Sequence, residues 1–279
     1  MMQRHPKWSI TSDDIDKVVE RTVKYDRIVV LGALGLVIVL SWAYLLAGAG
    51  QNMTAFEMTG LTSGSGMAKM MPAVWNISYA GVMFTMWWVM MVAMMLPSAA
   101  PMVLLFATIN RNQKEKGNPY VATTMFAAAY LTIWAGFSIV AVVLQWTLET
   151  LSLLSPVMIS ANGGLGGSIL IAAGLYQLTP LKQACLKSCR TPLRFIMSRW
   201  RRGNGGAFSM GLEHGAYCVG CCWFLMGLLF FGGVMNLYWI IGLAVFVLIE
   251  KTIPAGHWFS YGVGIVLILW GIIVLLNAL

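Results

Sequence analysis

Long apolar runs separated by short polar segments dominate the pattern of hydrophobic and polar positions along this 279-residue chain. A helix needs roughly 20 apolar residues to cross a hydrocarbon core about 30 Å thick. Runs of this kind occur near 27–47, 79–106, 121–147, 164–180, 207–231, 234–250 and 258–277. The pattern predicts an all-α fold, a polytopic integral membrane helix bundle with about seven transmembrane helices. The run at 164–180 is short and rich in glycine, so a six-span bundle with a re-entrant fourth segment is the alternative.

Two polar segments carry helical patterns of their own. Residues 11–26 combine candidate caps at Thr11 or Ser12 with acidic residues in the first turn and an apolar stripe, which predicts an amphipathic surface helix. In the loop 181–206, Pro192 begins a stretch of mixed apolar residues and arginines that predicts a helix lying in the lipid interface. The expected domains are therefore a cytoplasmic amphipathic N-terminal segment at 1–26 and a single transmembrane helical domain at 27–279.

The basic residues fall in alternate segments between the apolar runs. With seven spans, every one of the 18 Lys and Arg residues except Lys69 lies on the same side. Cytoplasmic loops carry an excess of Lys and Arg, so the N-terminus is predicted to be cytoplasmic and the C-terminus external. Topology thus accounts for the net charge of +8, and nucleic acid is not an expected partner. No cleavable signal peptide is expected either, because 1–26 lacks an apolar core.

A dense polar cluster lies inside the fifth run, where residues 213–223 read EHGAYCVGCCW. Polar residues within a span are costly and indicate function by default. Four potential metal ligands share one helix face within an arc of about 100°: His214, Cys218, Cys221 and Cys222. A rise of 1.5 Å per residue nevertheless separates His214 from Cys221 by roughly 10 Å along the axis. The cluster is therefore expected to form two neighbouring ligand pairs, or half of one site that another helix completes.

The second run offers sulfur ligands that could complete such a site. Because the second and fifth runs cross in opposite directions, Met90 and Met94 lie at the level of Cys218 and Cys221. Thiolate and thioether sulfur select Cu(I), whereas imidazole accepts copper and zinc alike. Copper is therefore the predicted metal and zinc the alternative. The methionines of this run share a face within an arc of about 80°, namely Met83, Met86, Met90 and Met94.

Neighbouring residues extend the candidate site. Pro97 and Pro101 are expected to interrupt the hydrogen bonds of the second run and to free carbonyl groups. Three glycines of the fifth run, at 211, 215 and 220, are expected to let the second run approach closely. On the cytoplasmic side, Cys185 and Cys189 form the motif CLKSC. On the external side lies a second thioether cluster, made of Met53, Met58, Met67, Met70 and Met71.

Structural roles compete with each of these interpretations. Methionine is a common gap-filler in apolar cores, and a buried cysteine such as Cys222 often acts as a small hydrophobe. Glu213 is expected to pair with an arginine of the loop 181–206, and Glu250 with Lys251 to anchor the sixth span. The predicted metal ligands are nonetheless His214, Cys218, Cys221, Cys222, Met86, Met90, Met94, Cys185 and Cys189.

Three stretches resemble a bacterial family of unknown function whose members are predicted to be metal-binding integral membrane proteins. They read MWWVMMVAMMLPSAAPM, YQLTPLKQACLKSCRTP and EHGAYCVGCCWFLMGLLFFGGVMNLYW, and the likeness covers residues 79–256. The resemblance implies metal binding without naming a metal or a reaction. The matching residues are Met90, Met94, Met95, Pro97, Pro101, Cys185, Cys189, His214, Cys218, Cys221 and Cys222.

These observations predict a multi-pass protein of the bacterial inner membrane that binds copper for transport or for delivery to a membrane metalloenzyme, rather than an enzyme. Expected partners are the lipid bilayer and a metalloenzyme complex or a metallochaperone, and no nucleotide-binding loop is present. One alternative is an accessory subunit of a membrane oxidase or monooxygenase. A further alternative is a membrane thiol-disulfide oxidoreductase, using Cys221 with Cys222 or with Cys218.

Overall fold

The computed structural model describes residues 12–51, 53–62, 74–112, 119–155, 158–160, 162–253 and 256–278. Within these ranges the regular elements are helices and no strand occurs, which confirms the all-α prediction. The helices are α1 Ser12–Leu46, α2 Ala55–Thr62, α3 Ile77–Asn112, α4 Pro119–Thr150, α5 Gly163–Leu178, α6 Pro180–Arg190, α7 Pro192–Arg199, α8 Gly203–Gly227, α9 Leu229–Gly232, α10 Leu237–Thr252 and α11 Gly256–Leu276.

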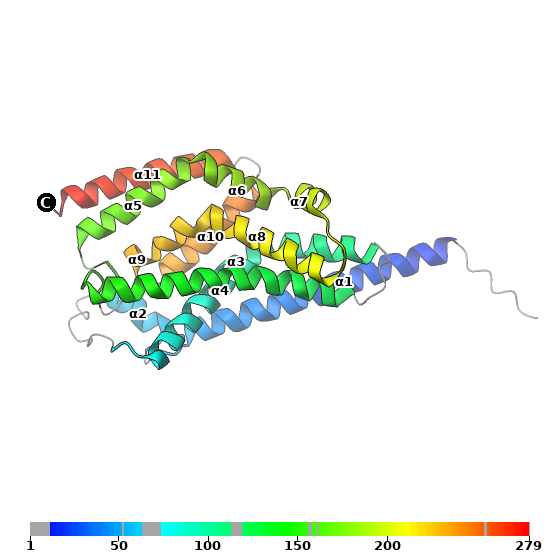
Figure 1. Cartoon of the computed structure of the whole chain (residues 1–279), viewed down its shortest axis with the longest axis horizontal. Helices are drawn as coiled ribbons and strands as arrows, with labels where there is room; N and C mark the ends of the chain where they lie inside the picture. The colour runs from blue at the N-terminus through cyan, green and yellow to red at the C-terminus, as the bar shows by residue number, and fades with distance from the viewer. Residues whose placement is uncertain are drawn as a thin grey trace, which may run out of the picture.

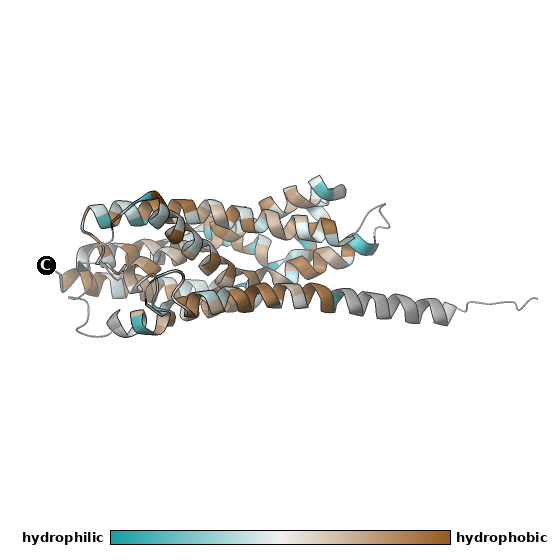
Figure 2. Cartoon of the chain, turned by 90° about the horizontal axis from the view of Figure 1, so that it is seen from below, coloured by the Kyte–Doolittle hydropathy of each residue, from teal (hydrophilic) through white to brown (hydrophobic). Residues whose placement is uncertain are grey.

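Several of these helices are long and apolar enough to cross a membrane. Within the described residues there are five such stretches: Arg27–Leu46, Ile77–Arg111, Tyr120–Thr150, Gly203–Gly232 and Trp258–Leu276. A sixth is added if α5 and α6 count as one bent span. The chain is therefore a helical membrane protein, and Figure 2 shows hydrophobic residues spread along most of the length of these helices. The count of seven spans stays a prediction, because α10 has 16 residues and is shorter than the roughly 20 residues that a spanning helix needs.

The long helices pack side by side, with α3 at the centre (Figure 1). About 61% of the spanning stretch of α3 is buried, against 22% for α1 and for α11. α3 contacts α1, α4 and α10, whereas α8 lies mainly along α4 and α6, and α11 along α5. The C-terminal end of α11 lies at the opposite end of the bundle from the start of α1 (Figure 1). Peripheral helices thus offer apolar faces to lipid while α3 forms the core.

Both helices predicted in the polar segments are present, with differences. α1 runs without a break from Ser12 into the first span, so the expected surface helix is the beginning of a longer helix. The second begins at Pro192 as predicted, and it packs Phe195 and Ile196 against the protein while leaving other apolar side chains exposed. Pro97 and Pro101 do not end α3, which continues through both.

A sharp bend separates α5 from α6 where the sequence predicted the end of the fourth span. Thr179 has an extended backbone, as expected before a proline, and its side chain caps α6 by accepting from the Lys182 backbone N–H. Pro180 begins α6, where its missing N–H costs nothing. The two helices therefore meet at 65°, and this bend turns α6 back against α8.

The contact between α5 and α11 depends on glycines that let the two backbones touch. A Cβ at Gly271 would lie 2.8 Å from the Gly167 carbonyl oxygen and 2.7 Å from Ile171 Cγ1. Gly271→Ala is therefore expected to lower the free energy of unfolding by about 1–3 kcal/mol, measured by thermal or denaturant unfolding in detergent. Gly262→Ala is the control on the same helix, because a Cβ there meets open space. Equal stability of the two variants would contradict this account of the contact.

Candidate metal centre

Cys218 lies at the centre of a group of polar and sulfur-bearing side chains inside the bundle. It is 1% exposed, and its sulfur lies 3.0 Å from Lys251 Nζ and 3.1 Å from Tyr130 Oη. Lys251 also donates to Ser98 Oγ at 3.1 Å. These four residues belong to α8, α10, α4 and α3, so the thiol of Cys218 sits where four helices meet.

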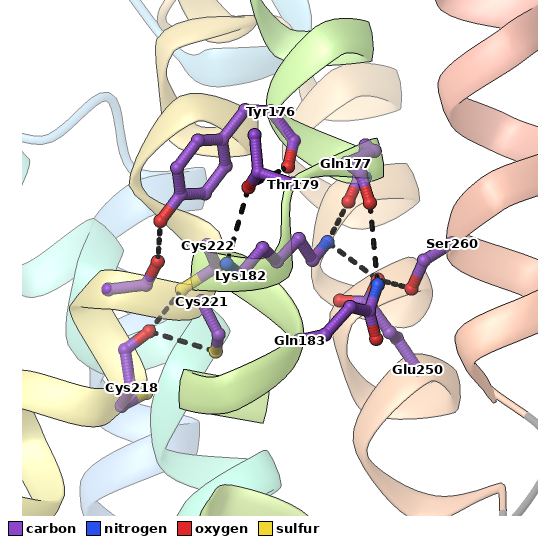
Figure 3. A network of polar contacts seen from close by, with 11 residues as sticks. Tyr176, Gln177, Thr179, Lys182, Gln183, Cys218, Cys221, Cys222, Glu250 and Ser260 are labelled. Carbon is purple, nitrogen blue, oxygen red and sulfur yellow. Dashed lines mark hydrogen bonds and ion pairs between the residues drawn. The ribbon is translucent and has the colours of Figure 1, made fainter. Parts of the chain in front are cut away.

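The next cysteines of α8 continue this group toward α3. The thiols of Cys221 and Cys222 both point to the Cys218 carbonyl oxygen (Figure 3), at 3.1 Å and 2.8 Å. The sulfur of Cys222 also lies 3.9 Å from Sδ of Met95 on α3. A cysteine thiol and a methionine thioether from different helices therefore meet in the buried core.

The methionine at this contact is one residue beyond those that the helical projection selected. Met95 is among the residues that match the family resemblance. It is not on the helix face that the sequence assigns to Met83, Met86, Met90 and Met94. Met86, Met90 and Met94 are each at most 1% exposed and lie in the hydrophobic core around α3. The structure thus places these three inside the bundle, and it places Met95 against the cysteines.

The glycines of α8 approach other helices than the sequence suggested. A Cβ at Gly211 would lie 2.2 Å from the Phe126 carbonyl oxygen and 2.8 Å from Ala129 Cβ, both on α4. Gly215 likewise faces α4, and Gly220 faces Cys185 on α6. The predicted close approach of the second run through these glycines is therefore wrong. The physical reason is that α4 presents the small side chain of Ala129 and its backbone at the crossing.

Cys185 and Cys189 are brought to the same region by the bend before α6. The sulfur of Cys185 lies 2.9 Å from the position that a Cβ of Gly220 would take. The thiol of Cys189 lies near those of Cys218 and Cys221. All 5 cysteines of the chain are free thiols, and α6 and α8 between them carry the whole set.

His214 lies one turn before Cys218 and is enclosed by aromatic rings. Its ring centroid is 6.0 Å from that of Phe126, 5.6 Å from that of Tyr130 and 5.7 Å from that of Phe195. His214 is 3% exposed, and its Nδ1 has no hydrogen-bond partner within the described part of the chain. Tyr130 therefore contacts both His214 and Cys218, and a buried imidazole nitrogen remains free to bind.

These groups are close together without forming a finished coordination shell. Among the described residues, no set of three or more His, Cys, Asp or Glu side chains surrounds one point in the way that a bound ion requires. A soft metal would therefore use methionine as well, or draw the thiols together by small side-chain movements.

Lys251 is a residue of this centre that the sequence placed elsewhere. The sequence predicts that Lys251 lies in the loop after the sixth span, where it would anchor that span together with Glu250. This predicted location is wrong. α10 continues to Thr252, so it carries Glu250 and Lys251 into the bundle, where they are 0% and 7% exposed. In the sequence, the position of Lys251 at the end of an apolar run was the feature that could have placed it in the centre. Tyr130 carried no such feature apart from its polar hydroxyl group.

Glu250 belongs to a second buried network beside the cysteines (Figure 3). Its Oε1 lies 2.6 Å from Lys182 Nζ, and both side chains are 0% exposed. Lys182 also donates to Gln177, and Ser260 donates to Glu250. Lys182 was expected in a basic cytoplasmic loop, but the bend before α6 turns it inward. The network joins α5, α6, α10 and α11.

Two further expectations concern the ends of the bundle. Glu213 pairs with Arg199 near the surface, as predicted. Of the external methionines, Met58 is buried in α2 at 6% exposure and Met53 packs against the core. Met67, Met70 and Met71 lie outside the described residues.

The fold and this centre define a class, that of helical membrane proteins with a buried, sulfur-rich centre where several helices meet. In the comparison with protein families, residues 84–274 match the family described as PpoB2, copper chaperone. This match covers more than half of the chain, so the chain belongs to that family. The metal-binding family resemblance seen in the sequence is thereby confirmed. No curated protein and no solved structure matches the chain.

Proposed function

We propose that this protein is a membrane-embedded copper chaperone that holds Cu(I) at Cys218, Cys222 and Met95 and passes it to a copper-using partner. The observation that carries the proposal is the contact of a buried thiol with a buried thioether, Cys222 with Met95, next to Cys218, whose carbonyl oxygen accepts from the Cys222 thiol. Soft sulfur ligands of this kind select Cu(I) over harder ions. Membership of a family described as copper chaperones supports the same metal.

Charge balance favours a monovalent ion at this position. A Cu(I) ion with two thiolates carries one net negative charge, and the Lys251 ammonium, 3.0 Å from Cys218 Sγ, supplies one positive charge. Burying a compensated group costs far less than burying an isolated charge. Ser98 and Tyr130 hold the cation and the thiol in place by hydrogen bonds, so the loaded centre would be electrically neutral.

The other predicted ligands extend this centre into a path. Cys189 and Cys221 neighbour Cys218, so they are the next sulfur ligands for an ion that leaves Cys222 and Met95. Cys185 follows on α6 beside Gly220. Because thiolates bind Cu(I) more tightly than thioethers, the buried thioethers of α3 would receive the ion and the thiols would hold it. These thioethers are Met86, Met90 and Met94.

His214 is proposed as an auxiliary ligand at the edge of the path. Its free Nδ1 is buried and lies on the same helix face as Cys218. Imidazole accepts zinc as well as copper, so zinc is the alternative metal if His214 dominates the site. We place the protein in the bacterial inner membrane, with a membrane metalloenzyme or a metallochaperone as the partner that receives copper.

The proposal is tested by Cu(I) titration of the full-length protein in detergent, under anaerobic conditions and against a chromophoric Cu(I) chelator. We expect tight binding of Cu(I), and Met95→Leu should weaken it by at least about tenfold, because it removes a proposed ligand and the loss of an outer-shell partner alone typically costs about 10- to 100-fold in metal affinity. Met91→Leu is the matched control, because this methionine of the same helix is equally buried and has no place in the proposed path. Absence of tight Cu(I) binding, or equal losses in the two variants, would count against the proposed centre.

A further inference from the structure

A basic pocket opens between α6, α7 and α8, on the side of α7 where its arginines lie. Its volume is about 220 Å³. Three of its lining residues are cations, Lys187, Arg194 and Arg199, and no acidic residue lines it. Such a concentration of positive charge is costly unless an anion lies among the cations.

Among the described residues, two of the three cations have no acidic counterpart. Arg199 pairs with Glu213, whereas no ion pair in the described part of the chain involves Lys187 or Arg194. Both residues line the pocket and are exposed. Their charges are therefore free to bind a ligand.

Hydroxyl groups complete the lining of the pocket. Ser188, Thr191 and Ser198 come from α6, its C-terminal cap and α7, and Tyr217 comes from α8. The hydroxyls of Thr191 and Ser198 donate to the carbonyl oxygens of Lys187 and Phe195. The remaining donors, from Ser188, Tyr217 and the Arg and Lys side chains, match the several oxygen atoms of a phosphate group, and charge-assisted hydrogen bonds to phosphate are among the stronger ones. The chemistry of the pocket therefore fits a phosphate-bearing anion.

The surroundings of the pocket indicate where such a phosphate comes from. α7 buries Phe195 and Ile196 against the protein but leaves Leu193 and Met197 54% and 72% exposed. Exposed apolar side chains beside arginines are typical of a helix at the level of lipid head groups. Acyl chains could then cover Leu193 and Met197 while the head group enters the pocket.

We propose that this pocket binds the phosphate head group of an anionic phospholipid. Lys187 and Arg194 form the charge clamp, and Arg199 contributes from its pair with Glu213. Basic pockets between helices on the cytoplasmic side of membrane proteins are suited to such head groups. The site is separate from the cysteines, although Phe195, which lines it, also packs against His214 with the two ring centroids 5.7 Å apart.

The test uses the full-length, metal-free protein in detergent, incubated with equal amounts of phosphatidylglycerol and phosphatidylcholine. Retained lipid is counted by native mass spectrometry. The double variant Lys187→Gln/Arg194→Gln is expected to retain about thirtyfold less phosphatidylglycerol, since each of the two basic residues near an anionic lipid contributes on the order of 1 kcal/mol. Retention of phosphatidylcholine should not change.

The matched control is Arg201→Gln/Arg202→Gln, which removes the same charge from the same loop outside the pocket. This control should retain phosphatidylglycerol as the unaltered protein does. Equal loss in the two double variants, or no loss in either, would overturn the proposal. Inorganic phosphate that binds as tightly as phosphatidylglycerol would also overturn it, because the ligand would then be a free anion.

Discussion

Replacing Cys218 with serine is expected to lower the affinity of the protein for Cu(I) by at least about 100-fold, since a hard hydroxyl replaces the central soft ligand. The fold should persist, because the serine hydroxyl can still accept from Lys251 and interact with Tyr130, which now contact Cys218 Sγ at 3.0 Å and 3.1 Å. The affinity is measured by competition with a Cu(I) chelator on the purified full-length protein.

The control for this variant is Ala216→Ser, which adds the same hydroxyl at an exposed position of α8. It should bind Cu(I) as the unaltered protein does. A Cys218→Ser protein with unchanged affinity would remove Cys218 from the centre and leave Cys222 with Met95 as the proposed ligand pair. Unfolding temperatures of both variants are measured alongside, so that loss of metal is distinguished from loss of fold.

The second large effect is expected for Lys182→Met, which removes one partner of a fully buried ion pair. Glu250 would keep its position in the core with Ser260 as a donor but without a compensating cation. Breaking a buried pair in this way costs about 3–5 kcal/mol, and the loss is measured as the change in the free energy of unfolding in detergent.

A double variant, Lys182→Met/Glu250→Gln, separates this explanation from simple loss of packing. Removing both charges should restore most of the lost stability, because an uncharged pair carries a much smaller desolvation penalty. Arg199→Met is the control for an exposed pair, since the Arg199 side chain is 47% exposed and its contact with Glu213 should be worth about 1 kcal/mol or less. If Arg199→Met and Lys182→Met destabilise equally, burial is not the cause.

The helical, membrane-spanning character was predictable because it depends on the length and composition of local runs. The start of α7 was predictable for the same reason, since Pro192 fixes the first residue of a helix. The course of the chain after Leu178 was not, although Thr179 and Pro180 indicate a helix boundary. Their sequence does not say that α6 turns by 65° and returns to the bundle.

The candidate centre was predictable only on its own helix. Spacing placed His214 and the α8 cysteines on one face, and the structure buries them together. The partners from other helices depend on packing, which is why projection selected Met94 where the contact is made by Met95. Lys251 was missed because the charge count treated it as a loop residue. A count of charges along the sequence cannot show that the Lys251 side chain contacts the Cys218 thiol on another helix.

The two neighbouring charges at the end of α10 also bear on how the protein is made. Glu250 pairs with Lys182 on α6, and Lys251 donates to Cys218 on α8, so both partners precede α10 in the chain. A translocon that released α10 alone would expose these charges to lipid, at a cost of about 2–4 kcal/mol for each near the centre of the bilayer. Membrane integration of α10 should therefore depend on α6 and α8 having already assembled. The contacts around Cys218 and Lys182 would then help to set the order in which the helices enter the membrane.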